Sequence, residues 1–262
     1  MKIYFLLLIA AGLSPTLAIF IAYLPWYVPE NDVKHVTFPM NIANAPHEYG
    51  YYFAQFYILT GQEKGSYIGL LPRTDAGPGM SVIRAAFSTF VPNSTTNDND
   101  YCHIGADGGP GITCAVDFDG TYAHTYNLEV RNTQGTTWNG TAVDTVTGRR
   151  IHIGSYTLPA GTGTTLEWRT GFVEYFPWPL PVARDWKCSD LPHTSVVFGV
   201  PSTDAGVGGL LKPAEHTPCD GQDNFKYNMT PDNGFDISLG FPGKVGKVRF
   251  QHEGYSEIGN GM

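Results

Sequence analysis

Tyr122, His124 and Tyr126 alternate along the segment TYAHTYNLEVR, which ends at Arg131. Alternate residues of a strand point to one face, so the three side chains are expected to lie together. A lyase that cleaves polysaccharides needs a base such as His or Tyr and a cation that neutralises the sugar carboxylate. The same face continues with apolar residues, however, and this pattern is more typical of packed, hydrogen-bonded core side chains. These four residues are therefore weak catalytic candidates.

The carboxylates of the expected strands are isolated from one another: Glu129, Glu167 and Glu174 each stand alone. Retaining hydrolysis of a glucan needs two carboxyl groups about 5 Å apart on one face. An E-x-D-x-E strand would supply them, and this pattern does not occur. Glu167 and Glu174 are separated by an odd number of residues, so an unbroken strand points them to opposite faces. Glu174, in FVEYF, is a candidate acid at a cleft; the ordinary alternative is a solvated or hydrogen-bonded strand residue.

A short acidic stretch, DFDG, contains Asp117 and Asp119 and resembles the opening of a calcium loop, with Asp107 nearby. The remaining ligands of such a loop are missing, and an Asp-Gly turn between strands explains the stretch more simply. We therefore expect no cofactor, with calcium as the single candidate ion at these three residues.

Two similar loops follow apolar runs: PRTDAGPG at residues 72–79 and PSTDAGVG at residues 201–208. In each, Pro ends a strand, the Asp side chain bonds nearby backbone and Gly supplies the positive φ that closes the turn. Turn chemistry alone explains the match. If the two strands ran in the same direction, Asp75 and Asp204 would share one rim and could bind calcium or sugar hydroxyls. Trp138 and Trp178 are the candidate exposed aromatic residues for binding a ligand.

The four cysteines, Cys102, Cys114, Cys188 and Cys219, predict two disulfides in an oxidising compartment, and three pairings are open. Pairing of nearest neighbours is favoured, because the loop HIGADGGPGIT between the first two has little apolar content to order it. A zinc site is the rival interpretation, but no C-x-x-C spacing occurs. Glycosylation sequons, a further sign of secretion, begin at Asn93, Asn139 and Asn228.

The first 18 residues predict a secretory signal peptide, in which Lys2 precedes an apolar stretch and small residues flank a cleavage site after Ala18. The uncharged run continues to Glu30, so an uncleaved anchor is the alternative, although prolines interrupt it. We expect a secreted protein with no other membrane segment. The formal charge of −8 disfavours nucleic acid and anionic membranes as partners.

Thirty-one glycines and 19 prolines separate short runs rich in Tyr, Phe, Val, Ile and Thr, which is typical of many short strands joined by turns. No segment of a dozen residues has helical periodicity. We predict an all-β antiparallel sandwich or jelly roll. The expected strands are KHVTFPMNI, YYFAQFYIL, SYIGLL, SVIRAAFSTF, HTYNLEV, RRIHIGSYTL, TLEWRTGFVEYF, SVVFGV, FDISLGF and KVRFQ. Residues 19–262 are expected to form a single domain, with 181–262 as a C-terminal part packed on it after a Pro-rich stretch.

Between Ala22 and Phe176 the chain contains, in this order, AYLPWYVP, YYFAQFYI, GSYIGLLPR, AAFSTF, GADGGPG, HTYNLEV, TGRRIHIGSYTLP and GFVEYF. This order resembles an uncharacterised family of secreted β-sandwich domains, related in shape to the concanavalin A-like lectins and glucanases. The resemblance implies a fold and an extracellular setting, and it implies no established activity.

By analogy of fold, the leading hypothesis is a secreted, glycosylated β-sandwich that binds carbohydrate. The alternative is a polysaccharide-cleaving enzyme, either hydrolase or lyase, that acts on extracellular glycans. A second alternative is a structural or interaction protein of the cell surface.

Overall fold

The computed structural model describes residues 19–29, 32–177, 187–216 and 219–244. They form two nine-stranded sheets, in which every pairing between named strands is antiparallel. Within these ranges the one helical element is a short 3-10 turn at Cys188–Asp190, and no helix is long and apolar enough to cross a membrane. The prediction of an all-β antiparallel sandwich is confirmed.

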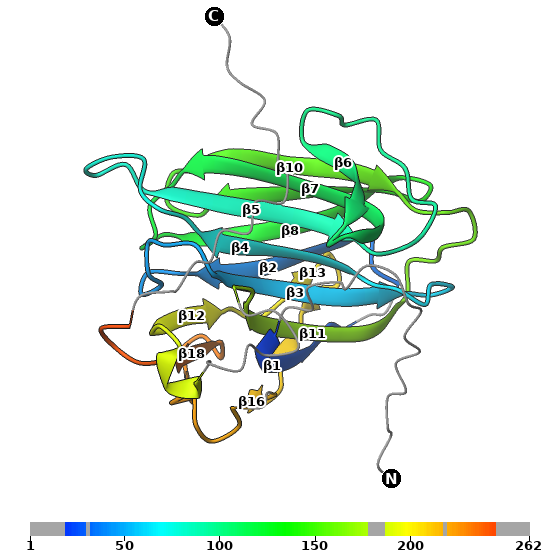
Figure 1. Cartoon of the computed structure of the whole chain (residues 1–262). Helices are drawn as coiled ribbons and strands as arrows, with labels where there is room; N and C mark the ends of the chain where they lie inside the picture. Colours follow the sequence, from blue (N-terminus) through cyan, green and yellow to red (C-terminus); the bar gives the residue numbers. More distant parts are fainter. Residues whose placement is uncertain (1–18, 30–31, 178–186, 217–218, 245–262) are drawn as a thin grey trace, which may run out of the picture.

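The first sheet has the strand order β15-β1-β11-β3-β4-β5-β7-β6, and β16 also pairs with β1. In Figure 1, β6 and β16 accordingly lie at opposite ends of the molecule. The bounds of its strands are β1 Ile19–Tyr27, β3 Tyr51–Leu59, β4 Ser66–Pro72, β5 Val82–Thr89, β6 Cys102–Ala106, β7 Gly109–Asp119, β11 Leu166–Tyr175, β15 Gly209–Leu210 and β16 Ala214–Glu215.

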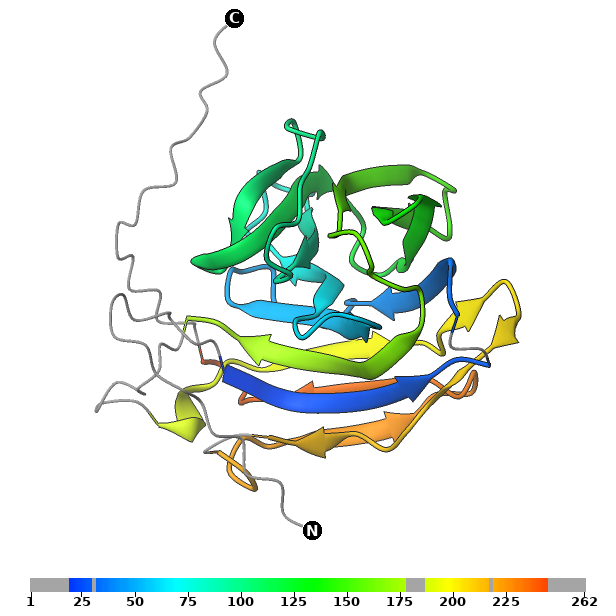
Figure 2. The same cartoon turned by 90° about the vertical axis from the view of Figure 1, so that its right-hand side faces the viewer.

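The second sheet has the order β10-β9-β8-β2-β12-β18-β17, and the short strand β13 pairs with β2 and with β14. Its strands are β2 His35–Asn41, β8 Thr125–Gln134, β9 Thr137–Asp144, β10 Arg150–Thr157, β12 Thr194–Phe198, β13 Ser202–Thr203, β14 Gly206–Val207, β17 Lys226–Met229 and β18 Phe235–Leu239. The described C-terminal strands thus complete both sheets, and Figure 2 shows them, in yellow and orange, beside the blue β1 and the lime β11.

The main core lies between the sheets and follows the alternation of strand side chains. In β2, for example, Val36, Phe38 and Met40 are buried and the residues between them are half-buried. Large aromatic residues from β3 and β11, including Tyr51 and Tyr175, fill the same layer. Burial of this apolar surface is the main stabilising contribution to the fold.

Both predicted disulfides are present. Cys102 and Cys114 are directly paired across β6 and β7, with a Cα–Cα distance of 4.0 Å. Cys188 and Cys219 have a Cα–Cα distance of 5.5 Å and join the 3-10 turn to the loop before β17. The predicted signal peptide, residues 1–18, lies outside the described residues.

Candidate functional site

The outer face of the first sheet, which points away from the second sheet, carries an apolar cluster of its own. On β3 the alternating residues Tyr51 and Phe53 enter the main core, whereas Tyr52 and Ala54 belong to this outer cluster. The outer cluster consists of the buried residues Tyr52, Ala54, Tyr67, Ala86 and Phe172. A sheet with one face in water needs no such residues on that face, so the outer cluster marks a candidate binding surface.

The aromatic rings of the outer cluster are held edge to face. The ring centroid of Tyr52 lies 5.5 Å from that of Tyr67 and 5.6 Å from that of Phe172. Tyr67 also contacts Phe90, at 5.3 Å between centroids. Ala54 on β3 and Ala86 on β5 flank Gly69 of β4, so small residues lie side by side on these three strands. The outer cluster thus combines packed aromatic rings with a row of small residues.

Glu174 borders this surface from β11. It pairs directly with Tyr52 of β3, so both side chains point to the outer face. Desolvation and, to a lesser extent, the nearby Asp107 carboxylate raise the pKa of Glu174 to about 8. No hydrogen bond to another described residue offsets the desolvation of its charge. Glu174 is therefore protonated at neutral pH, which is unusual for a strand glutamate and typical of a functional carboxyl group.

Asp107 lies in the tight turn between β6 and β7, where its φ of 48° and the φ of 76° at Gly108 form a hairpin turn. Desolvation raises the pKa of its carboxyl group, and a hydrogen bond from Tyr67 opposes that shift. Two carboxyl groups with different environments thus face one surface, an arrangement that can divide the roles of acid and base. Both residues are candidates from the sequence, but for separate roles.

Two hydroxyl groups at this surface have no hydrogen-bond partner among the described residues: Tyr52 Oη and Ser88 Oγ, both buried. Ser88 pairs with Tyr67 across β4 and β5, so it points to the same face. A buried polar group without a partner carries a free-energy cost of about 1–3 kcal/mol. Such groups are the ones that a bound ligand can satisfy.

The predicted lyase residues have structural roles. The Tyr122 hydroxyl accepts a hydrogen bond from the Arg73 N–H at 2.9 Å and donates to backbone carbonyls. Tyr126 is buried, and His124 contacts Asp144 at 2.9 Å. Arg131 contacts the His35 ring at 3.0 Å. They do not converge on one cleft.

The three predicted calcium ligands do not converge either. Asp117 accepts two hydrogen bonds from Arg84, at 2.6 and 3.0 Å. Asp119 pairs with Arg149 at 2.8 Å, and Asp107 faces Tyr67 instead. Among the described residues no group of three metal-binding side chains is found.

The two similar loops lie at opposite ends of the second sheet. Asp204 contacts His35, the first residue of β2, at 3.2 Å. Asp75 contacts His47, beyond the other end of β2, at 2.7 Å. The two aspartates therefore do not share a rim, and the match of the loops reflects two separate turns.

The other sequence candidates are scattered. Trp138 is buried in the main core, so the expectation of an exposed aromatic residue was wrong there, and Trp178 lies outside the described residues. Of the sequons, Asn93 and Asn228 are exposed and Asn139 is half-buried on β9. Glycosylation stays a prediction.

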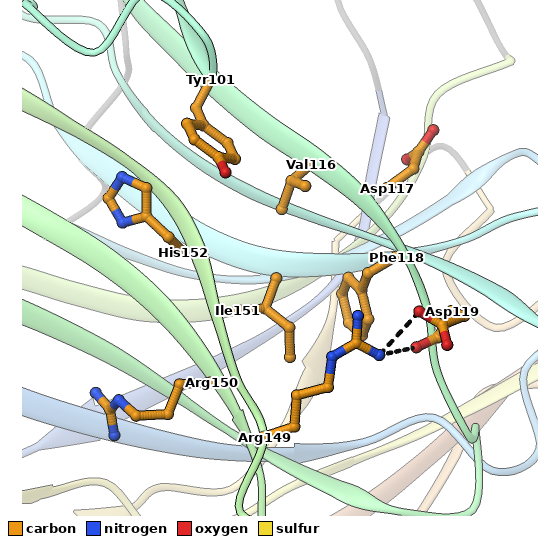
Figure 3. Close-up of a pocket in the computed structure, with 9 residues that line it drawn as sticks. All are labelled: Tyr101, Val116, Asp117, Phe118, Asp119, Arg149, Arg150, Ile151 and His152. Atoms are coloured by element: carbon orange, nitrogen blue, oxygen red, sulfur yellow. Dashed lines mark hydrogen bonds and ion pairs between the residues drawn. The ribbon is translucent and has the colours of Figure 1, made fainter.

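An open groove runs along the seam between β7 and β10, and Figure 3 shows its lining. Arg149 reaches across it to Asp119, and Tyr101 stands edge-on to His152 with 4.9 Å between ring centroids. His152 in turn contacts Asp98 at 2.6 Å. The polar side chains that line this groove are largely paired within the protein, so the outer cluster is the stronger candidate for a binding surface.

No family model and no curated protein matches the chain. Solved structures with a similar fold include scytalidoglutamic peptidase with a transition-state analogue inhibitor, with a TM-score of 0.43 and 10% identity over 86% of this chain and 98% of that one. A second structure of that peptidase, with a peptide-based transition-state analogue, has a TM-score of 0.46 and 10% identity over 85% and 100% of the chains. SCP-B, an eqolisin-family peptidase in complex with the tripeptide Ala-Ile-His, has a TM-score of 0.44 and 9% identity over 86% and 100%.

These comparisons correct the sequence-based hypothesis of function. The similar structures are those of peptidases, whereas the hypothesis was a carbohydrate-binding protein or a polysaccharide-cleaving enzyme. The physical basis of that hypothesis also fails at Trp138, which is buried. The resemblance to a β-sandwich holds for the fold, and no match supports a lectin or glucanase family.

Proposed function

We propose that this chain is a secreted hydrolase that uses carboxyl groups to cleave polypeptide at apolar positions, on the outer face of the first sheet. The observation that carries the proposal is Glu174, whose pKa of about 8 keeps it protonated beside the apolar outer cluster. A protonated carboxyl group in an apolar setting is a suitable general acid.

The proposed reaction divides the work between the two carboxyl groups. Asp107, whose carboxyl group accepts a hydrogen bond from Tyr67, accepts a proton from a water molecule as that water attacks the amide carbon. Glu174 donates its proton to the departing amine nitrogen, and the C–N bond breaks. The proton taken up by Asp107 returns to Glu174 through solvent. Water and an amide thus give a carboxylic acid and an amine, with no other reactant.

The surface favours an apolar polypeptide because the outer cluster is apolar and its polar groups are few. Its members are the small residues Ala54 and Ala86 and the aromatic residues Tyr52, Tyr67 and Phe172. The unpartnered hydroxyl groups described above can bond the amide groups of a bound backbone, which also needs partners when it leaves water. Secretion is supported by the two disulfides, which persist in oxidising compartments.

The test is cleavage of a mixture of synthetic peptides of varied sequence by the purified chain between pH 4 and 9, followed by mass spectrometry. We expect cleavage next to large apolar residues, with a rate that falls as pH rises through about 8 and Glu174 ionises. Glu174→Gln should lower kcat/KM by at least about 100-fold, the usual contribution of a general acid.

Glu167→Gln is the matched control, because Glu167 is an exposed carboxylate of the same strand. It should leave kcat/KM unchanged. The proposal is wrong if the wild-type chain cleaves no peptide at any pH, or if Glu174→Gln cleaves as fast as the wild type.

A further inference from the structure

We propose that Arg73 and Arg84 form an anchoring site for a carboxylate of the bound polypeptide, either its C-terminus or an acidic side chain. The inference deepens the proposed function, on which it rests for the identity of the ligand. Its evidence is separate from Glu174 and consists of an excess of positive charge at one edge of the outer face.

The two arginines share a single carboxylate. Arg84 donates two hydrogen bonds to Asp117, at 2.6 and 3.0 Å, which already occupy both carboxylate oxygens. Arg73 Nε lies 3.7 Å from the same Asp117 oxygen, too far for a hydrogen bond. Two guanidinium groups and one carboxylate leave a net charge of about +1 at this point.

Arg73 is the less well paired of the two arginines. Its Nε is buried and makes no hydrogen bond among the described residues, and its contact with Asp117 is a long one. Desolvation lowers the pKa of Arg73, the neighbouring Arg84 lowers it further, and Asp117 opposes both effects. A buried donor of a charged group without a partner is costly, and a carboxylate is the planar acceptor that fits a guanidinium group.

The Arg73 side chain is also held in place. Its guanidinium carbon lies 5.1 Å from the ring centroid of Tyr49, which is a cation–π contact. Its backbone N–H donates to the Tyr122 hydroxyl. Asp75, on the same loop, is occupied by His47 at 2.7 Å. A donor that is held in place and makes no hydrogen bond is pre-organised for a ligand.

Arg149 and Arg150 differ from this pair. Arg149 contacts Asp119 at 2.8 Å and Arg150 contacts Glu129 at 2.6 Å, so each has a carboxylate to itself. The protein as a whole has a formal charge of −8, which makes a local excess of positive charge more informative.

The position of the pair suits a ligand that also reaches Glu174. Arg84 is on β5 and shares the outer face with Ala86, two residues further on. From β11 to β5 the order is β11-β3-β4-β5, three strand spacings or about 14 Å. An extended peptide covers this distance with about four residues. A carboxylate on the arginine pair therefore places the peptide bond about four residues away at Glu174.

The experiment measures peptide binding rather than cleavage. A fluorescent peptide of six apolar residues is prepared with a free C-terminus, with an amidated C-terminus, and amidated with one internal Glu. Binding to the Glu174→Gln protein is followed by fluorescence anisotropy. We expect the peptide with a free C-terminus to bind at least 10-fold more tightly than the amidated peptide without Glu. The amidated peptide with an internal Glu shows whether a side-chain carboxylate binds the arginine pair as tightly as a C-terminal one.

Arg84→Met should remove this 10-fold preference without weakening the binding of the amidated peptide. Arg84→Lys keeps the charge but loses the planar guanidinium group that forms two parallel hydrogen bonds to a carboxylate, so it should reduce the preference for the free acid. This variant replaces Arg84→Met in the test if Arg84→Met fails to fold. Arg150→Met is the matched control on the second sheet and should change nothing. Equal binding of acid and amide by the parent protein, or an equal loss for both peptides in Arg84→Met, overturns the inference.

The outcomes separate the two proposals. If the acid preference is found and depends on Arg84 while the wild-type chain cleaves nothing, the anchoring site stands and the hydrolase proposal fails. If peptides are cleaved but acid and amide bind alike, the hydrolase stands and the anchoring site fails.

Discussion

Glu174 and Tyr52 lie directly opposite each other on β11 and β3, and both point to the outer face. An acidic side chain has thus been placed where its charge is desolvated, which costs stability whenever it ionises. The pKa of about 8 in the fold, against an ordinary value of 4.5, makes this cost measurable.

The first prediction is a fall in stability with rising pH. Because the folded pKa is raised, the folded state holds a proton between pH 4.5 and 8 that the unfolded state has lost. The free energy of unfolding should therefore decrease across that window, by up to about 1.4 kcal/mol per pH unit for this one group. Urea unfolding at pH 5, 6, 7 and 8 measures this decrease.

In Glu174→Gln, the free energy of unfolding should lack the part of the pH dependence that comes from this group, and an unchanged pH dependence contradicts the assignment. Glu167→Gln, the exposed control, should keep it.

A second carboxyl pair, Glu215 and Asp223, should also make stability depend on pH. Asp223 is fully buried, its Oδ1 accepts the Phe225 N–H at 3.2 Å and its Oδ2 has no conventional partner among the described residues. Desolvation, then hydrogen bonding with Asp220 and Asp223, raises the pKa of Glu215 to about 7. Because the folded pKa of Glu215 is raised, its protonated form is favoured in the fold, and the free energy of unfolding should decrease as pH rises through about 7.

Glu215→Gln tests the pair, because an amide can donate to Asp223 without needing the proton. We expect the variant to melt higher than the wild type at pH 8 by about 2–4 °C, the shift that 1 kcal/mol gives in a domain of this size. At pH 5 the difference should disappear or reverse. An increase in the wild-type melting temperature on adding calcium at pH 8 would show that a cation, rather than a proton, joins these carboxylates.

The sequence predicted the fold because alternation and turn residues are local signals. It missed β1, which continues the apolar leader, and β9 in the second sheet. It also missed the β6–β7 hairpin, which was interpreted as a Gly-rich loop tied by its disulfide. The Asp107-Gly108 pair, with φ of 48° and 76°, was the available hairpin signal.

The candidate site was only partly predictable. Glu174 could be named from the sequence, but not its surroundings, because a strand such as YYFAQFYIL does not reveal which of its apolar faces is the outer one. The parity argument for Glu167 and Glu174 also assumed an unbroken strand, whereas β11 has a register shift between Leu166 and Trp168. The arginine pair depends on contacts between β5, β7 and a loop, which no local pattern encodes.

The contact of Gly154 with the first disulfide gives the next prediction. A Cβ at Gly154 would lie 2.5 Å from Cys102 Sγ and 2.5 Å from Cys114 Cβ. Gly154→Ala should therefore lower the free energy of unfolding by about 1–3 kcal/mol through overpacking, in addition to the strain of its φ of 153°. Gly135→Ala is the control, since its φ of 56° is also positive but nothing lies within 4 Å of its Cβ position. Equal losses in chemical denaturation would remove the steric explanation.

Gln55 is a polar side chain in the main core whose replacement should stabilise the protein. It is fully buried on β3, and neither its Oε1 nor its Nε2 has a hydrogen-bond partner among the described residues. It fills the space above Gly171, where an added Cβ would lie 2.9 Å from Oε1. An apolar residue of similar length should fill that space without the cost of two unpaired polar atoms.

Gln55→Met should accordingly raise the free energy of unfolding by about 1–3 kcal/mol, measured by urea denaturation. Gln62→Met is the control, because Gln62 Nε2 donates to Thr162 at 2.6 Å and its loss should destabilise the protein. Gln55 lies on the face of β3 opposite to Tyr52 and Glu174, so peptide cleavage by Gln55→Met should equal that of the wild type. Loss of cleavage in a well-folded Gln55→Met protein would mean that the reaction uses the inner face of β3, and the site on the outer face would then be wrong.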